Sequence, residues 1–192
     1  ANGGNVIIGN ALDGVTIQNG AADNFVYGNL IGLNAANARL GNGRFGVVAA
    51  GAGSNRNAIG GPNPLQGNVI SANGQAGVWL GETATQNNVQ GNKIGTDAAG
   101  AAALGNQLSG VVVDAANTNL IGGPGAGEGN LISGNQQHGI SLQNGATQNT
   151  VAGNRIGTDA AGAAALGNQL SGVQINAAND NTIGGTTTQR GA

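Results

Sequence analysis

Short runs in which aliphatic and polar residues alternate recur along the whole chain. Each run is only three to five residues long, which suits a strand whose alternate residues face a core and is too short for an amphipathic helix. One series has the form Gly-(Val/Ile)-x-aliphatic and recurs at intervals of 32, 31, 33, 29 and 33 residues. It predicts six short strands of one type, opening at Gly14, Gly46, Gly77, Gly110, Gly139 and Gly172.

Two further series accompany the first. The pattern Asn-x-(Val/Ile) ends on Val26, Ile59, Val89, Ile121, Val151 and Ile183. The pattern Gly-Asn-x-Ile ends on Ile7, Ile31, Ile70, Ile94, Ile132 and Ile156. A chain that returns to the same three strand types about every 31 residues, with Gly and Asn at the corners, predicts a solenoid whose turns, or rungs, stack as parallel sheets. We expect about six rungs of three short strands.

The aliphatic positions of each series should stack in the interior of the solenoid. The first series predicts one such stack at Val15, Val47, Val78, Val111, Ile140 and Val173. In the other two series an Asn stands two residues before the inward aliphatic residue, so its side chain should also point inward. The third series then predicts a ladder of amide hydrogen bonds at Asn29, Asn68, Asn92, Asn130 and Asn154. Ligand binding by these asparagines is the alternative, and their place beside turn glycines favours the structural interpretation.

A longer repeat groups the rungs in pairs. The 21 residues of Gly91–Val111 recur at Gly153–Val173 with one change, Lys93 to Arg155. A catalytic site is normally assembled once from unlike residues, so this repetition indicates architecture. Units of about 62 residues occur almost three times, and residues 1–192 should therefore form a single domain of about three double-rung repeats.

The links between strands differ in length on alternate rungs. The link that follows Ile70 or Ile132 is short, whereas an Ala/Gly-rich link, GTDAAGAAALGNQLS, follows Ile94 and Ile156. We expect these longer loops to lie on one side of the solenoid, two rungs apart. There they should cover the outer sheet face at Val69 and Leu131, which would otherwise meet water.

With these motifs in view, the whole chain resembles the right-handed parallel β-helix repeats of secreted and surface proteins of bacteria, in particular repeats of the form GNxIGTDxxG...LGN. The resemblance implies an all-β, right-handed parallel β-helix and an extracellular or cell-surface location in a bacterium. Related β-helices include polysaccharide lyases, glycosidases, phage tailspikes and adhesin stalks. The fold alone therefore does not select an activity.

Composition and charge exclude several classes of protein. The chain has 39 glycines without collagen spacing, and only 7% of its residues are charged. The net charge is −2 and the six Lys and Arg residues are scattered, so we expect no nucleic-acid partner. No apolar run approaches the length of a membrane span, and no Cys is present for disulfides or thiolate metal sites. We expect no cofactor.

Both ends of the chain fall within the repeat pattern. The chain starts at Ala1 instead of Met, GGNVIIGN already has the third-strand form, and only TTTQRGA remains beyond the last second-strand motif. Neither end carries the helical apolar stripe of a cap. We expect a segment of a longer protein or end-to-end stacking of molecules into a fibre. Tails that fold back as caps are the remaining alternative.

The acidic residues and the single histidine are the candidates for catalysis or metal binding. Glu82 and Asp114 both follow first-series strands and could approach one another, but the acids form no cluster within a rung, so we expect no catalytic residues and no enzymatic activity. His138 should be a turn residue that faces solvent. Asp97 and Asp159, in GTDAAG, are candidate calcium ligands, although one carboxylate per loop favours an Asx turn.

Trp79 is the strongest candidate for ligand binding. In GVWL, Val78 and Leu80 should face inward, so Trp79 should face outward between Val48 and Val112 on the neighbouring rungs. An exposed indole between two valines suits stacking on a sugar ring or docking of a protein. The resemblance to parallel β-helices, which commonly present such faces to sugars, favours carbohydrate. A loop or tail that covers the indole is the alternative.

The function expected from these observations is that of a non-enzymatic extracellular stalk or scaffold, with adhesive faces or self-assembly into fibres. Its partners would be flanking repeats or further copies at the rung ends, a polysaccharide or a cell-surface protein. The alternative is a carbohydrate-binding or polysaccharide-cleaving β-helix whose active rungs lie partly outside this segment.

Overall fold

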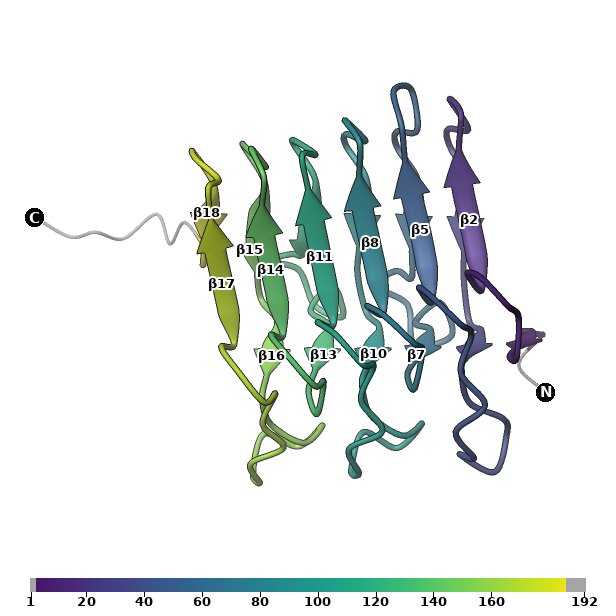
Figure 1. The fold of residues 1–192 in the computed structure, drawn as a ribbon. Coiled ribbons are helices and arrows are strands. Elements are labelled where there is room, and N and C mark those ends of the chain that lie inside the picture. The colour runs from purple at the N-terminus through teal and green to yellow at the C-terminus, as the bar shows by residue number, and fades with distance from the viewer. Residues whose placement is uncertain (1–2, 186–192) are drawn as a thin grey trace, which may run out of the picture.

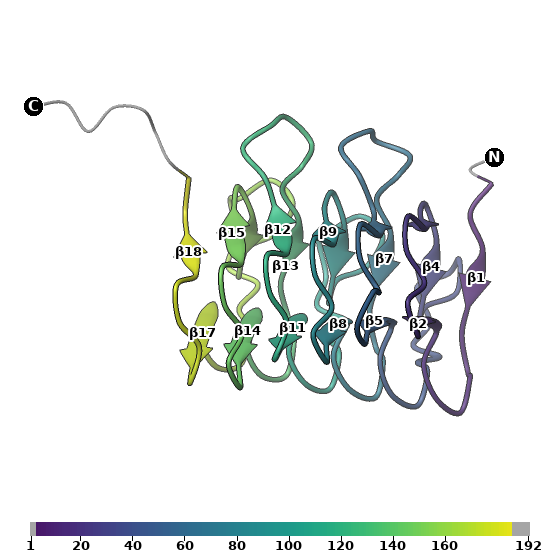
Figure 2. The same cartoon turned by 90° about the horizontal axis from the view of Figure 1, so that it is seen from above.

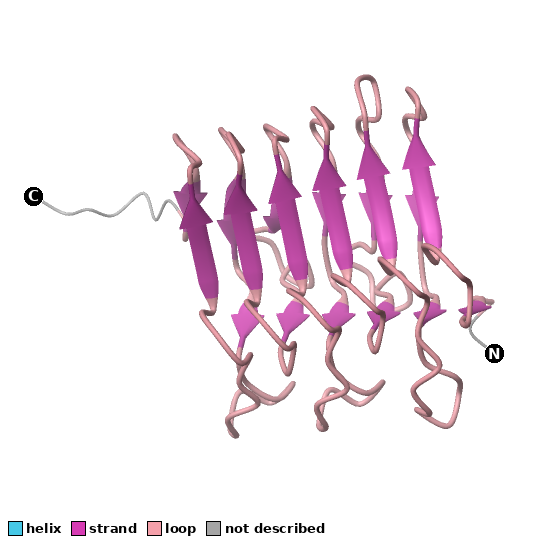
Figure 3. Cartoon of the chain, viewed as in Figure 1, coloured by secondary structure: helices cyan, strands magenta, loops and turns pink. Residues whose placement is uncertain are grey.

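The chain forms a parallel β-solenoid without helices (Figures 1 and 3). The computed structural model of the protein describes residues 3–185. Its eighteen strands form three parallel sheets of six strands each, and every rung contributes one strand to each sheet. The predicted all-β solenoid with three strands per rung is therefore confirmed. The predictions made for the C-terminal tail from residue 186 onward fall outside the described residues.

The three sheets correspond to the three sequence series. The sheet of the third series, here the β1 sheet, contains β1 (Val6–Ile7), β4 (Leu30–Ile31), β7 (Val69–Ile70), β10 (Lys93–Ile94), β13 (Leu131–Ile132) and β16 (Arg155–Ile156). The sheet of the first series, the β2 sheet, contains β2 (Val15–Gln18), β5 (Val47–Ala50), β8 (Val78–Gly81), β11 (Val111–Asp114), β14 (Ile140–Gln143) and β17 (Val173–Asn176). The β3 sheet contains β3 (Phe25–Val26), β6 (Ala58–Ile59), β9 (Asn88–Val89), β12 (Leu120–Gly122), β15 (Thr150–Ala152) and β18 (Thr182–Ile183).

The interior consists of stacked aliphatic side chains from all three sheets. Strand register aligns equivalent residues of successive rungs, so that Val47 pairs with Val78 and Val78 with Val111. The predicted first-series stack is confirmed, and its four central members are fully buried. At the two ends of this stack, Val15 and Val173 are half-buried and pack against the core. Burial of a given position therefore depends on having a rung on both sides.

The predicted asparagine ladder is present. At Asn92, for example, the backbone N–H and Nδ2 both donate to Asn130 Oδ1 at 3.0 Å, and Nδ2 also donates to the carbonyl of Ile59 at 2.7 Å. Each carboxamide therefore bridges two rungs and leaves no buried amide group unpaired. The second series builds a matching ladder from Asn24, Asn57, Asn87, Asn119, Asn149 and Asn181.

A third ladder was not predicted. Its asparagines stand four residues before the glycine that opens each β2-sheet strand, in a turn where no alternating pattern marks them. They are hydrogen-bonded in the same way and comprise Asn10, Asn42, Asn73, Asn106, Asn135 and Asn168. All three corners of the solenoid are thus closed by asparagine.

The Ala/Gly-rich loops project from one edge of the molecule on alternate rungs (Figure 1). Successive loops are joined, because Ala160 N–H donates to the Gly100 carbonyl at 2.9 Å and Ala98 N–H donates to Asn37 Oδ1 at 3.1 Å. A side chain on Gly100 would lie 2.8 Å from Leu131 Cδ2, so the loop packs directly on the outer face of the β1 sheet. The predicted cover over Leu131 is confirmed.

Two further loops, residues 60–68 and 123–130, project beside the β3 sheet (Figure 2). These loops also occur on alternate rungs, so they follow the same double-rung repeat as the Ala/Gly-rich loops. Within residues 3–185, no helix is long and apolar enough to cross a membrane.

Candidate functional site

Trp79 faces outward on β8, as predicted. The strand register places Val48 of β5 on one side of it and Val112 of β11 on the other. The two valines, which were named with Trp79 as candidate ligand-binding residues, offer little surface to a ligand, because Val48 and Val112 are only 4% and 9% exposed. They are buried in a small apolar cluster on the outer face of the sheet, which also contains Phe45, Ala50 and Ala76.

Phe45 explains why this cluster is buried. Its ring stacks on the indole of Trp79, with ring centroids 5.3 Å apart and planes 9° apart. The backbone N–H of Phe45 donates to Asp13 Oδ1 at 3.0 Å, and the guanidinium of Arg44 lies 5.2 Å from the ring centroid. The indole therefore has one face covered by a fixed aromatic ring and remains half-buried overall.

A groove of about 230 Å³ runs beside Trp79 over the outer face of the β2 sheet. Phe45 belongs to the rung before Trp79, whereas most of the other lining residues come from the three rungs that follow it. Trp79 thus lines the groove together with Phe45 and residues of the following rungs. The remaining lining residues are Leu108, Ser109, Val112, Asp114, Gln137, His138, Ser141, Gln143 and Gln174.

Polar side chains form a connected floor in this groove. Ser141 Oγ lies 3.1 Å from both Gln143 Oε1 and Gln174 Oε1, and Gln143 Nε2 donates to Asp114 Oδ2 at 3.2 Å. The Asp114 carboxylate also accepts from Asn144 Nδ2 at 2.9 Å. The floor therefore offers hydroxyl, amide and carboxylate groups across three neighbouring strands, β11, β14 and β17.

His138 lies at the edge of the same groove. It was expected to be a turn residue that faces solvent, but it is half-buried and its Nδ1 accepts the backbone N–H of Ser171 at 3.2 Å. In the neutral ring this acceptor role leaves the proton on Nε2. Phe45, Ser109 and His138 each directly precede the glycine that opens a β2-sheet strand. Aligning the residue before this glycine across the rungs would have shown from the sequence that the three side chains lie along the same edge of the sheet.

Asp97 and Asp159 close their own loops. Asp159 Oδ1 accepts the N–H groups of Ala163 and Ala164 at 2.8 and 3.2 Å, and Asp97 Oδ1 accepts those of Ala101 and Ala102 at 2.7 and 3.1 Å. The N–H groups of Ala164 and Ala163 lower the pKa of Asp159. These contacts match the turn interpretation of both residues.

The first repeat closes its shorter loop with a neutral residue. Asn34 Oδ1 accepts the N–H groups of Ala36 and Ala38, both at 2.9 Å. The loop therefore requires an acceptor oxygen but not a charge. Among residues 3–185, no three His, Cys, Asp or Glu side chains gather closely enough to hold a metal ion.

The pairing of Glu82 with Asp114 is limited to the backbone. Asp114 lies opposite Gly81 in the strand register, and the N–H of Glu82 donates to the Asp114 carbonyl at 3.2 Å. The Asp114 carboxylate instead binds the amides of Gln143 and Asn144.

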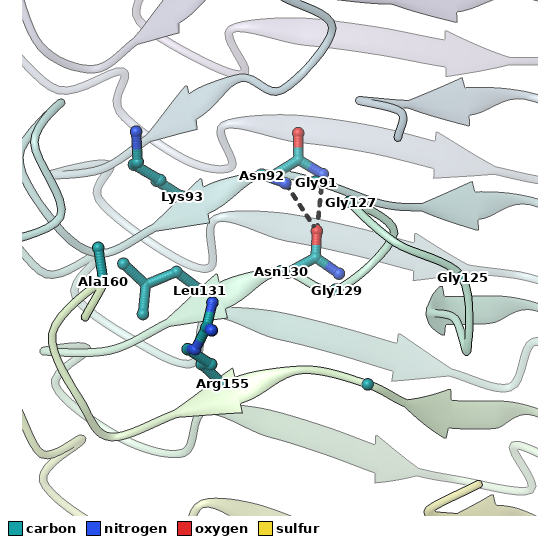
Figure 4. Close-up of a pocket in the computed structure, with 11 residues that line it drawn as sticks. Gly91, Asn92, Lys93, Gly125, Gly127, Gly129, Asn130, Leu131, Arg155 and Ala160 are labelled. Carbon is teal, nitrogen blue, oxygen red and sulfur yellow. Dashed lines mark hydrogen bonds between the residues drawn. The ribbon is translucent and has the colours of Figure 1, made fainter. Parts of the chain in front are cut away.

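A second hollow, of about 430 Å³, lies over the outer face of the β1 sheet (Figure 4). Lys93, Leu131 and Arg155 stand on three successive strands beside it, with the Asn92–Asn130 step of the ladder alongside. Lys93 Nζ donates to the Ala98 carbonyl at 2.8 Å, so its ammonium group holds the base of the long loop. Lys93 therefore has a structural role in this hollow.

No family model, curated protein or solved structure matches the chain. The class of protein is therefore defined by the fold itself, a parallel β-solenoid with asparagine ladders.

Proposed function

We propose that this chain is a non-enzymatic structural segment, a stalk or scaffold within a secreted or surface protein of a bacterium. The extracellular and bacterial setting is part of the proposal and rests on the resemblance of the GNxIGTDxxG...LGN repeats. The observation that carries the scaffold role is the continuity of the three asparagine ladders across all six rungs. A chain that repeats its own corners so uniformly is built to extend along one axis.

The use of the acidic residues supports this proposal. A glycosidase needs two carboxylates that face one glycosidic bond, and a lyase needs a base beside the substrate carboxylate. Here Asp97 and Asp159 accept backbone N–H groups, and Asp114 accepts side-chain amides. Asp23 pairs with Arg56 at 2.7 Å, and this contact lowers the pKa of the Asp23 carboxyl.

The ladders also have a direction, which supports end-to-end assembly. Each asparagine donates to the Oδ1 of the next rung, so within the described residues the first-rung Oδ1 atoms of Asn5, Asn10 and Asn24 accept no hydrogen bond. At the other end, the backbone N–H groups of Asn154, Asn168 and Asn181 have no partner within residues 3–185. Among residues 3–185, acceptors without a partner in the first rung therefore match donors without a partner in the last, which is the relation that stacking of a further rung, from this chain or from another copy, requires.

A panel of polysaccharides tests the scaffold proposal against the enzymatic alternative. The purified chain should release no reducing ends or unsaturated products from any polysaccharide of the panel. Product release that continues through repurification of the protein would overturn the proposal and favour the polysaccharide-cleaving alternative.

The assembly part of the proposal needs a separate measurement. Light scattering over a concentration series should show self-association, and electron microscopy should show rods or filaments one solenoid wide. A strictly monomeric species at high concentration would contradict end-to-end stacking.

A further inference from the structure

We propose that the groove beside Trp79 is a binding site for a neutral oligosaccharide. This inference goes beyond the scaffold role, because a stalk needs no groove on its outer face. It rests on three properties of the groove: an aromatic wall, a polar floor and the sign of its charge.

The aromatic wall is held in place by its neighbours. Phe45 covers one face of the indole, and the centroid separation of 5.3 Å shows that the two rings are in contact. A side chain on Gly81 would lie 2.3 Å from Trp79 Cζ2, so the indole also rests on the backbone of its own strand. The ring is thus held in place before any ligand arrives, and it lines the groove. A flat apolar surface of this kind suits the C–H face of a pyranose ring.

The polar floor suits the hydroxyl groups of a sugar. The Ser141 hydroxyl has one hydrogen for two acceptors, Gln143 Oε1 and Gln174 Oε1, so one glutamine carbonyl remains available to a ligand. His138 adds an Nε2 donor at the edge when its ring is neutral. Sugar hydroxyls both donate and accept, and a floor with mixed donors and acceptors pairs with them.

The charge of the groove excludes acidic sugars. Asp114 is the only acidic residue among the lining residues, and no Lys or Arg lines the groove. Arg44 stacks on Phe45, which belongs to the rung on the other side of Trp79. A uronate or sulfated ring over Ser141 would lie near the Asp114 carboxylate without a cation to compensate, so like-charge repulsion selects neutral rings.

The extent of the groove indicates the size of the ligand. The floor spans β11, β14 and β17, and two strand spacings amount to about 10 Å across the sheet. This length takes more than one pyranose ring. The ligand would then run along the solenoid axis, across the strands.

The experiment uses tryptophan fluorescence, because Trp79 is the only tryptophan of the chain. The intact protein is titrated with soluble neutral hexaoses built from glucose, mannose or xylose, and with hexagalacturonate as the acidic probe of equal length. We expect a saturable change in emission with at least one neutral hexaose and none with the acidic probe. Titration calorimetry on the same samples gives the affinity independently of the fluorophore.

Variants locate the site. Trp79→Ala and Gln174→Ala should each weaken neutral binding about tenfold or more in calorimetry. Phe25→Ala removes an aromatic ring that is 68% exposed on the β3 sheet and serves as the matched control, with binding unchanged. Asp114→Asn should retain neutral binding and admit hexagalacturonate. Gln174 lies on β17, the last β2-sheet strand within residues 3–185, so its replacement by alanine tests the site without disturbing the apolar cluster around Trp79.

The proposal is overturned if no neutral hexaose binds to protein whose circular dichroism shows an intact fold. It is equally overturned if Gln174→Ala and Trp79→Ala bind as the unchanged protein does, or if hexagalacturonate binds the unchanged protein as tightly as the neutral probes. A second copy of the chain as occupant would appear as self-association that is lost in Trp79→Ala, without any response to glycans, and would overturn the proposal. These outcomes are separate from product release, which tests the scaffold role.

Discussion

Two nearly identical stretches of the chain, Gly91–Val111 and Gly153–Val173, have the same local structure and different surroundings. In both, the long loop is closed by an antiparallel bridge, between Thr96 and Ala103 in one and between Thr158 and Ala165 in the other. The surroundings differ because two more strands of the β1 sheet follow β10, whereas β16 is its last strand within the described residues.

The consequences of this difference appear in burial. Ile94 is fully buried and Leu108 half-buried, whereas their equivalents are a half-buried Ile156 and a Leu170 that is 60% exposed. The repeat sequence therefore determines the shape of a rung, and the neighbouring rung determines how much apolar surface it buries. Stability in such an array is a sum of rung and interface contributions, and the interface contribution is absent at an open end.

The largest effect should come from the interior isoleucines. Ile94→Ala should lower the free energy of unfolding by about 2 to 5 kcal/mol, because the side chain leaves a cavity that the stacked rungs cannot close. The same change at Ile156 should cost about 1 kcal/mol, because that side chain is already partly in water. Urea unfolding followed by circular dichroism measures both. Equal losses would show that rung position does not control the contribution of this residue.

A smaller effect is expected in the third asparagine ladder. Asn106 is buried and bridges Asn73 to Asn135, so Asn106→Ala should cost about 1 to 3 kcal/mol through the amide groups left unpaired. Asn168 is half-buried and can exchange its contacts with water, so Asn168→Ala should cost under about 1 kcal/mol. The same urea experiment compares the two variants. A larger loss of unfolding free energy in Asn168→Ala than in Asn106→Ala would contradict the claim that neighbouring rungs determine how much each ladder asparagine stabilises the fold.

The smallest effect concerns Asp159. Its pKa is lowered in the folded chain by the N–H groups of Ala164 and Ala163, so its stabilising contribution is present above its ordinary pKa and is lost as pH falls through the lowered value. Asp159→Asn should lower the melting temperature at pH 7 only slightly, because the neutral Asn34 closes the corresponding loop of the first repeat. In acid, the unchanged protein should lose slightly more stability than the variant. Differential scanning calorimetry between about pH 6 and pH 2 makes the comparison.

Melting with and without calcium tests whether Asp97 and Asp159 close their loops or bind the metal ion. Added calcium should leave the melting temperature of the unchanged protein where it is, and Asp97→Ala should melt at the same temperature with and without it. A calcium-dependent rise in melting temperature that Asp97→Ala or Asp159→Asn removes would overturn the structural role of these loops.

Most of the fold could be predicted from the sequence because the strands follow a period of two. That period fixes which residues face inward, and the recurrence of the three series fixes the register, so the stacks, two of the ladders and the outward direction of Trp79 were predicted correctly. The long loops follow the same regularity. Long and short links alternate along the third series, so the sequence predicted that the long loops lie on alternate rungs.

The turns could not be predicted in the same way. A side chain in a corner has no alternating neighbour, and its direction follows from the backbone angles of that corner. Phe45 and His138 lie in such corners, as does the third ladder, and all three were missed or misjudged. Because Phe45 folds over the sheet, Val48 is buried on a face where the pattern alone indicated exposure.

Hydrogen exchange at the two matching stretches tests most directly the claim that neighbouring rungs, and not local sequence, supply the stability. Mass spectrometry of peptides from Gly91–Val111 and Gly153–Val173 compares amides with nearly identical chemistry, so intrinsic exchange rates largely cancel. Exchange in the first stretch should be slower by about tenfold or more, because β10 and β11 have strands on both sides. Equal protection of the two stretches under conditions where the protein is monomeric would contradict the account.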